Sequence, residues 1–276
     1  MSARVPPSVL AALGVLGLLA ATAVFAGQLS RYDPGAVSLG DRLTPPALFG
    51  GTWRHPLGTD TLGEDVLSRV IYGGRISLIV GLCAVAISGT IGIGLGTLAG
   101  YLGGGVDDVI MRVAEIQLAF PSILLYVSIM AVLGPGLGKI ILVIGIVSWV
   151  AYARIERGVV FGLREREFVE AARAMGAPTW AIIRRHILPN TLGPMIVVAS
   201  FTLAGAIITE ASLSFLGLGV PPAVPSWGRM LADGRDYLER GWWIATAPGI
   251  AIMLVVLAVN ITGDWLRDVL DPRLRI

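Results

Sequence analysis

Long stretches without a charged side chain dominate the hydrophobic pattern of this chain. Five of them are rich in Leu, Ile, Val and Ala and contain no Asp, Glu, Lys or Arg: residues 5–30, 76–106, 116–138, 186–209 and 241–263. A helix of about 20 apolar residues crosses the hydrocarbon layer of a bilayer. Each stretch therefore predicts a membrane-spanning helix.

A sixth span is predicted from about residue 137 to 155. Lys139 and Arg154 stand near its two ends, where long basic side chains reach the membrane interfaces. Residues 211–228 are also uncharged, but their Gly and Pro content predicts a structured loop. The pattern thus predicts an all-α integral membrane protein with six transmembrane helices, at about 1–28, 76–100, 113–134, 137–155, 190–210 and 242–263.

The first hydrophobic stretch has two interpretations. Arg4, the apolar run and the small residues Ala21, Ala23 and Ala26 also resemble a cleavable signal peptide. The run continues to Gln28, which is longer than the usual apolar core of about 7–15 residues in such a peptide. The length favours an uncleaved N-terminal helix.

Composition supports a membrane protein and excludes several other classes. Of 276 residues, 55% are hydrophobic and 14% charged, the mean hydropathy is +0.77 and the net charge is +2. A soluble domain has about 25% charged residues, and a nucleic-acid-binding surface needs a larger positive charge. Cys83 has no partner cysteine, and His55 and His186 are the only histidines. We therefore expect the lipid bilayer as a partner, no nucleic acid and no metal site.

The distribution of basic residues predicts the orientation. Seven arginines lie between Arg154 and Arg185, and Arg4, Arg273 and Arg275 stand near the termini. Because basic loops stay in the cytoplasm, we place residues 164–189 and both termini on the cytoplasmic side. The membrane is then the cell membrane, that is, the inner or plasma membrane. Residues 29–74 then form an extracytoplasmic loop, either a small lobe or an interfacial helix around 63–72. The remaining spans form one core, residues 75–276.

A short charged segment, residues 164–190, carries the main functional signal. Phe168, Ala172 and Met175 fall on one stripe of a predicted amphipathic helix. Gly176 suits a left-handed residue after this helix, and Pro178 suits the first turn of a second helix that ends at Pro189. The segment predicts either two helices that meet at an elbow or an amphipathic helix lying among lipid headgroups.

Motif spacing resembles the EAA loop of ABC-type import permeases. The matching residues are Glu170, Ala171, Ala172, Gly176, Leu188 and Pro189. Residues 55–78, 100–112, 119–125, 210–231 and 260–275 resemble the second permease subunit of dipeptide, oligopeptide and nickel importers. Two positions depart from that pattern: Glu64 replaces an expected basic residue, and Trp265 replaces a small one.

The resemblance implies a permease that forms half of a pathway for short peptides. A homologous second permease would form the other half, an extracytoplasmic binding protein would deliver the solute, and two ATPase subunits would bind ATP and Mg. Glu170, Ala171, Ala172, Met175, Gly176, Leu188 and Pro189 would couple the chain to the ATPases. The chain itself has no GxxxxGK[ST] phosphate loop, so we expect no enzyme activity and no cofactor in it. A nickel-chelate importer of the same family and an ion-coupled secondary transporter remain alternatives.

Polar residues near the predicted spans are candidates for structural or gating roles. Glu115, Glu156, Glu210 and Asp264 lie near span ends, where each is expected to reach an interface or an arginine. Glu210 and Asn260 are candidate gate residues, although Asn260 is expected to hydrogen-bond across helices. An exposed Trp227 in the outer loop 217–239 is a candidate contact for the binding protein. Gly89, Gly92 and Gly96 predict close helix packing or, alternatively, a flexible gate.

Overall fold

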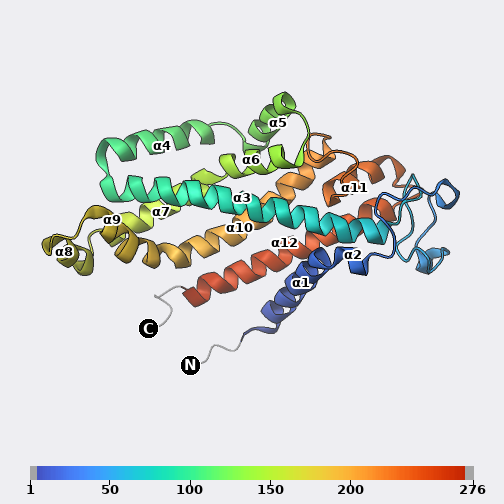
Figure 1. Ribbon diagram of the computed structural model, residues 1–276, viewed down its shortest axis with the longest axis horizontal. Helices are drawn as coiled ribbons and strands as arrows, with labels where there is room; N and C mark the ends of the chain where they lie inside the picture. Colours follow the sequence, from blue (N-terminus) through green and yellow to red (C-terminus); the bar gives the residue numbers. More distant parts are fainter. Residues whose placement is uncertain (1–4, 271–276) are drawn as a thin grey trace.

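The computed structural model describes residues 5–270, and most of this part of the chain is helical. Figure 1 shows an elongated bundle whose long helices run side by side. The helices are α1 (Pro7–Val24), α2 (Ala26–Leu29), α3 (Val66–Leu102), α4 (Gly104–Leu118), α5 (Ser122–Leu133), α6 (Leu137–Val147), α7 (Trp149–Leu163), α8 (Glu167–Ala174), α9 (Thr179–Ile182), α10 (Leu188–Phe215), α11 (Trp227–Gly234) and α12 (Trp243–Leu270). Arg4, Arg273 and Arg275, which entered the orientation argument, lie outside the described residues.

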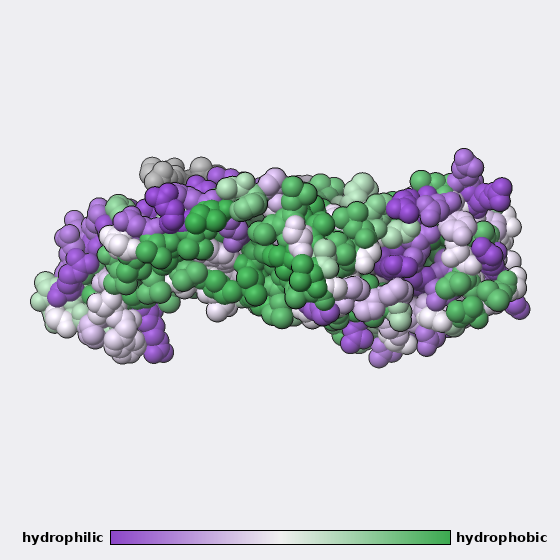
Figure 2. All heavy atoms as spheres, turned by 90° about the horizontal axis from the view of Figure 1, so that it is seen from above, coloured by the Kyte–Doolittle hydropathy of each residue, from purple (hydrophilic) through white to green (hydrophobic). Residues whose placement is uncertain are grey.

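The two ends of the bundle differ from its middle. We call the end formed by α8 and α9 the elbow end, and the end formed by residues 30–65 and 216–242 the loop end (Figure 1). Figure 2 shows hydrophobic side chains over the middle of one face and hydrophilic side chains gathered at both ends. This distribution matches a molecule whose middle lies in hydrocarbon and whose ends lie in water.

Five helical stretches are long and apolar enough to cross a bilayer, namely Pro7–Val24, Val66–Leu102, Leu137–Leu163, Thr179–Phe215 and Trp242–Leu270. This confirms the all-α membrane fold. The span predicted over 113–134 is not a single helix, because α4 and α5 meet at an angle of 85°. Pro121 precedes α5, and a proline disfavours helical geometry at the residue before it. The bent pair, counted as one, makes the sixth span.

α3 is longer than its predicted range of 76–100. It begins at Val66 because the Asp65 carboxylate accepts a hydrogen bond from the backbone N–H of Ser68 at 2.8 Å and caps the helix. The predicted interfacial helix around 63–72 is therefore wrong, since most of this segment forms the first turns of α3. The predicted span 137–155 likewise extends to Leu163, with an interruption at Ser148 between α6 and α7.

Glycines on α3 allow its backbone to contact that of α7. A Cβ atom at Gly96 would lie 2.6 Å from the carbonyl oxygen of Ala153, and one at Gly100 would lie 2.7 Å from that of Arg157. Gly92 meets α7 in the same way, one helical turn earlier. No side chain fits between the two helices at these positions. The prediction of close packing is confirmed for this stripe, which we call the glycine seam.

Two large apolar clusters join the helices of the bundle. The first joins α3, α5, α6 and α10 around Met130, Ile140 and Leu213. The second joins α3, α10, α11 and α12 around Ile207, Trp227 and Val255. α3 and α10 belong to both clusters and so form the central pair.

We expect Gly96→Ala to destabilise the protein by about 1–3 kcal/mol, because the added methyl group overpacks the seam. Gly94→Ala is the matched control, since nothing lies within 4 Å of a Cβ atom at Gly94. Alanine favours a helix over glycine by about 1 kcal/mol, so the control should be as stable as the native protein or more so. Thermal unfolding of the purified proteins in one detergent measures both. Equal unfolding temperatures for the two variants would contradict a tight seam.

Candidate functional site

Two short helices meet at an elbow after α7. α8 ends at Ala174, with Met175 as its C-cap, and Gly176 follows with φ +78°, the left-handed geometry that glycine adopts without strain. The N–H of Ala177 donates to the carbonyl of Ala172 at 3.1 Å, and the N–H of Gly176 donates to that of Arg173 at 3.0 Å. This pair of bonds is a Schellman motif, which ends a helix and turns the chain. The predicted elbow and the role of Gly176 in its backbone are confirmed.

The inner side of the elbow packs against the bundle. Val169 and Ala172 of α8 are buried against Val160 of α7. Ile182 of α9 and Ile187 of the turn after it belong to the same buried cluster. Tyr101, near the end of α3, also packs against this cluster. The elbow is therefore fixed to α3 and α7.

The outer side of the elbow is exposed and partly apolar. Met175 is 81% exposed, Trp180 60% and Phe168 42%, and Glu170 and Ala171 are exposed beside them. The predicted single stripe of Phe168, Ala172 and Met175 is wrong, because only Ala172 faces the bundle. Val169, which the stripe omitted, takes the inner position with it. The elbow thus presents unburied apolar side chains at one end of the molecule.

The second helix of the elbow does not end at Pro189, contrary to the prediction. α9 continues through a π-helical turn, Ile183–Ile187, into α10, so residues 179–215 form one long helix. The π turn places Pro189 at the start of a new α-helical run, where a missing N–H is tolerated. Leu188 is half-buried and Pro189 is exposed at this junction. The elbow is therefore continuous with a membrane-crossing helix.

Two carboxylates lie fully buried in the bundle and pair with hydroxyl groups. Ser77 donates to Glu210 at 3.1 Å and Ser214 donates to it at 2.7 Å, while Thr97 donates to Glu156 at 2.9 Å. Within residues 5–270, neither carboxylate forms an ion pair. The expectation that both reach an interface or an arginine is wrong.

The other candidates from the sequence fall in different surroundings. Glu115 is exposed and pairs with Arg112 at 3.2 Å, and Asp264 is exposed. Asn260 is half-buried and makes no side-chain hydrogen bond with the described part of the chain, so the expected bond across helices is absent there. Among residues 5–270, no hydrogen bond joins the two candidate gate residues, Asn260 and Glu210.

Trp227 is buried, so the prediction of an exposed aromatic anchor is wrong. Only 1% of it is accessible, and its indole N–H donates to the carbonyl of Val70 at 2.9 Å. A Cβ atom at Gly73 or Gly74 would lie 2.9 Å from the indole ring. Trp227 therefore fixes α11 onto the start of α3 and is unavailable to a partner.

A cluster of charged side chains at the loop end, three of them buried, was not predicted from the sequence. The Arg69 guanidinium contacts the carboxylates of Asp60 and Glu64 and lies 3.4 Å from Asp233, which also pairs with Arg229 at 3.0 Å. Arg69 lies on α3 and Asp233 on α11, so the cluster joins two segments 164 residues apart. The close spacing of Asp60, Glu64 and Arg69 in the sequence could have predicted that they pair. Nothing in the sequence indicated that Asp233 would join them. We call these five residues the Arg69 cluster.

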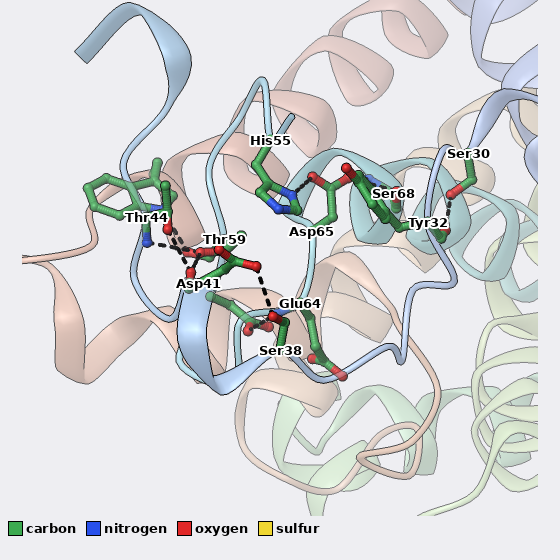
Figure 3. Close-up of polar contacts among 12 residues, drawn as sticks. Ser30, Tyr32, Ser38, Asp41, Thr44, His55, Thr59, Glu64, Asp65 and Ser68 are labelled. Atoms are coloured by element: carbon green, nitrogen blue, oxygen red, sulfur yellow. Dashed lines mark hydrogen bonds and ion pairs between the residues drawn. The ribbon is translucent and has the colours of Figure 1, made fainter. Parts of the chain in front are cut away.

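Neighbouring hydrogen bonds order the loop that carries this cluster. Figure 3 shows His55 directed at Asp65, with His55 Nδ1 2.9 Å from the Asp65 carboxylate, which also accepts the Ser68 hydroxyl at 2.7 Å. The backbone N–H of Thr44 donates to the Thr59 hydroxyl at 2.9 Å. These bonds fold residues 30–65 into the small lobe that the sequence left open as one of two alternatives. No group of three or more His, Cys, Asp or Glu residues suited to a metal ion occurs within residues 5–270.

Comparisons with known proteins agree with this architecture. A family model described as the binding-protein-dependent transport system inner membrane component matches residues 92–276. The di/tripeptide transport system permease protein DppC of Pseudomonas aeruginosa (strain UCBPP-PA14) is 48% identical, over 94% of this chain and 86% of that protein. The probable D,D-dipeptide transport system permease protein DdpC of Escherichia coli (strain K12) is 41% identical, over 94% and 85%. The glutathione transport system permease protein GsiD of Pectobacterium atrosepticum is 43% identical, over 97% and 87%.

A solved structure supports the fold. The MetNI methionine ABC transporter, in an inward-facing conformation, contains a chain that matches with a TM-score of 0.59 and 20% identity, over 74% of this chain and 96% of that one. Fold and relatives together define a multi-pass membrane subunit of a transport system. The chain belongs to the family of binding-protein-dependent transport system inner membrane components. The resemblance to peptide-importer permeases, stated from the motifs, is confirmed.

The surroundings of Glu64 in the Arg69 cluster predict that the stability of the loop end depends on pH. Burial raises the pKa of Glu64 from 4.5 to about 7, and the nearby Arg69 charge offsets only part of that rise. The contribution of Glu64 to stability is therefore complete below about pH 4.5 and is lost as the pH rises through about 7.

We expect the unfolding temperature to rise between pH 8 and pH 5.5 by less in Glu64→Gln than in the native protein, because the amide mimics the protonated acid. Glu115→Gln is the control, since the Glu115 side chain is 66% exposed. Thermal unfolding at both pH values measures the difference. The same pH response in native protein and Glu64→Gln would show that Glu64 titrates normally.

Proposed function

We propose that this chain is one of two permease subunits in an ATP-driven importer of short peptides. The observation that carries this proposal is the elbow, which exposes apolar residues outward while its inner side is fixed to the ends of α3 and α7. The names of the three relatives given above include di/tripeptides, D,D-dipeptides and glutathione. They support peptides over the nickel chelates that the motif pattern left open.

The elbow is the contact with an ATPase subunit. Met175 and Phe168 supply apolar surface, and Glu170 supplies a charge beside them. Exposed apolar groups of this kind are typical of a docking surface. Because α9 is continuous with α10, a displacement of the elbow passes directly into a membrane-crossing helix. Ala171, Ala172, Gly176, Leu188 and Pro189 shape this connection.

The remaining partners follow from the same assembly. ATP and Mg bind to the two ATPase subunits, and this chain needs no cofactor of its own. A homologous second permease completes the pathway. The binding protein meets the loop end through the outer loop 217–239, with residues other than the buried Trp227. Both termini and the elbow lie in the cytoplasm, and residues 29–74 lie outside.

We expect Gly176→Val to reduce both peptide uptake and substrate-stimulated ATP hydrolysis, because a β-branched residue in left-handed geometry costs roughly 1–2 kcal/mol and turns α8 away. Space is not the cause, since nothing lies within 4 Å of a Cβ atom at this glycine. Gly176→Asn is the matched control, because asparagine tolerates this geometry. ATP-dependent uptake of labelled dialanine by the full complex in vesicles measures the effect. Native uptake and ATPase activity in Gly176→Val, at equal expression, would exclude the coupling role.

The orientation is tested by thiol labelling of intact cells. In a chain with Cys83→Ala, we expect Arg54→Cys to react with a membrane-impermeant reagent and Arg166→Cys to remain unlabelled until the cells are opened. Both positions are exposed, so accessibility within the protein is matched. Labelling of Arg166→Cys from outside would reverse the orientation and remove the elbow from the ATPase side.

A further inference from the structure

Two helix breaks are linked by side-chain hydrogen bonds. One lies between α4 and α5 at residues 119–121, and the other lies at Ser148 between α6 and α7. The Gln117 amide links them, because its Nε2 donates to the carbonyl of Val147 at 2.6 Å and its Oε1 accepts from the Trp149 indole at 3.0 Å. Tyr126 and Ser148 add a hydroxyl pair at 3.2 Å. The two breaks therefore form one hydrogen-bonded junction.

A cavity of about 280 Å³ adjoins this junction. α10 closes one side of it with Thr202, Gly205 and Thr209. Its polar residues are all neutral, and they are Gln117, Ser122, Tyr126, Ser148, Thr202 and Thr209. The Thr202 hydroxyl donates to the carbonyl of Val198 at 2.8 Å, and Thr209 makes no side-chain hydrogen bond with the described residues. Hydroxyl groups in the cavity thus retain capacity for a ligand.

The cavity lies beside a membrane-crossing stretch, because Ser148 is within the span Leu137–Leu163. Ser148 follows eleven residues after the first residue of α6, which corresponds to about 17 Å of helix. Interrupted backbone and polar side chains at such depth are tolerated only where they face protein or a water-filled path. Ser122, Ala151 and Gly205 are exposed, so the cavity opens on the surface of this chain. That opening needs a polar path or a protein partner beside it.

We propose that this cavity binds the backbone amide groups of a peptide on its way through the membrane. The inference deepens the proposed function and rests on it. Hydroxyl and amide side chains both donate and accept hydrogen bonds, as a peptide amide does. The neutral lining suits substrates that share only their backbone. The junction holds the two breaks in place so that these groups face the path, as discontinuous helices do in other transporters.

The test measures protection of a cysteine in the cavity. The full complex carries Cys83→Ala and Ser122→Cys, and a charged thiol reagent modifies it in the presence of dialanine or alanine. We expect dialanine to slow the modification and alanine, which has no peptide bond, to leave it unchanged at the same concentration. Leu124→Cys is the control, because Leu124 is 58% exposed on the same helix and lies outside the cavity lining.

A second variant tests the hydroxyl contact. Adding Thr209→Val should raise the dialanine concentration for half-protection by about threefold to tenfold, the effect of one neutral hydrogen bond. No protection, equal protection by alanine, or an unchanged half-protecting concentration would each overturn the site. Uptake of dialanine by the same complex, with Cys83→Ala alone, is measured in vesicles. Absent uptake overturns the proposed function and this site with it, whereas uptake without protection overturns the site alone.

Discussion

Because glycines occupy one face of α3, its backbone lies directly against that of α7, and both ends of the molecule depend on this contact. α3 has 37 residues, about 55 Å of helix, and reaches from the Arg69 cluster to the apolar cluster under the elbow. α7 leads from the seam to α8 through a short turn at residues 164–166. The seam therefore joins the elbow end to the loop end through two helices in backbone contact.

The sequence predicted most of the spans, because charge and hydrophobicity largely determine which segments cross a bilayer, but it did not predict the 85° bend between α4 and α5. It also predicted the left-handed Gly176, since a glycine after an amphipathic helix is a local signal. The boundaries were less readable. The first turns of α3 contain Arg69 and Arg75, so the charge-free interval began ten residues too late, whereas the cap at Asp65 depends on the fold of the loop before it.

The candidate site was predictable only where local spacing determined it. Trp227 was read as exposed because aromatic residues in Gly/Pro loops often are, but the small residues Gly73 and Gly74, far away in sequence, create its binding surface. The Arg69 cluster similarly required Asp233 from another segment. Glu156 and Glu210 were predicted to reach an interface or an arginine. Both instead accept hydrogen bonds from hydroxyl groups on the facing helix α3. Such partners follow from tertiary packing, which pattern reasoning does not contain.

The order of synthesis gives the Arg69 cluster a further significance. Arg69 meets Asp60 and Glu64 within its own neighbourhood of the chain, but Asp233 is made 164 residues later. Until α11 has been synthesised, Arg69 lacks its contact with Asp233, and the carbonyl of Val70 lacks the indole N–H of Trp227. The loop end can therefore be completed only after α10, the penultimate span, and α11 have both been synthesised.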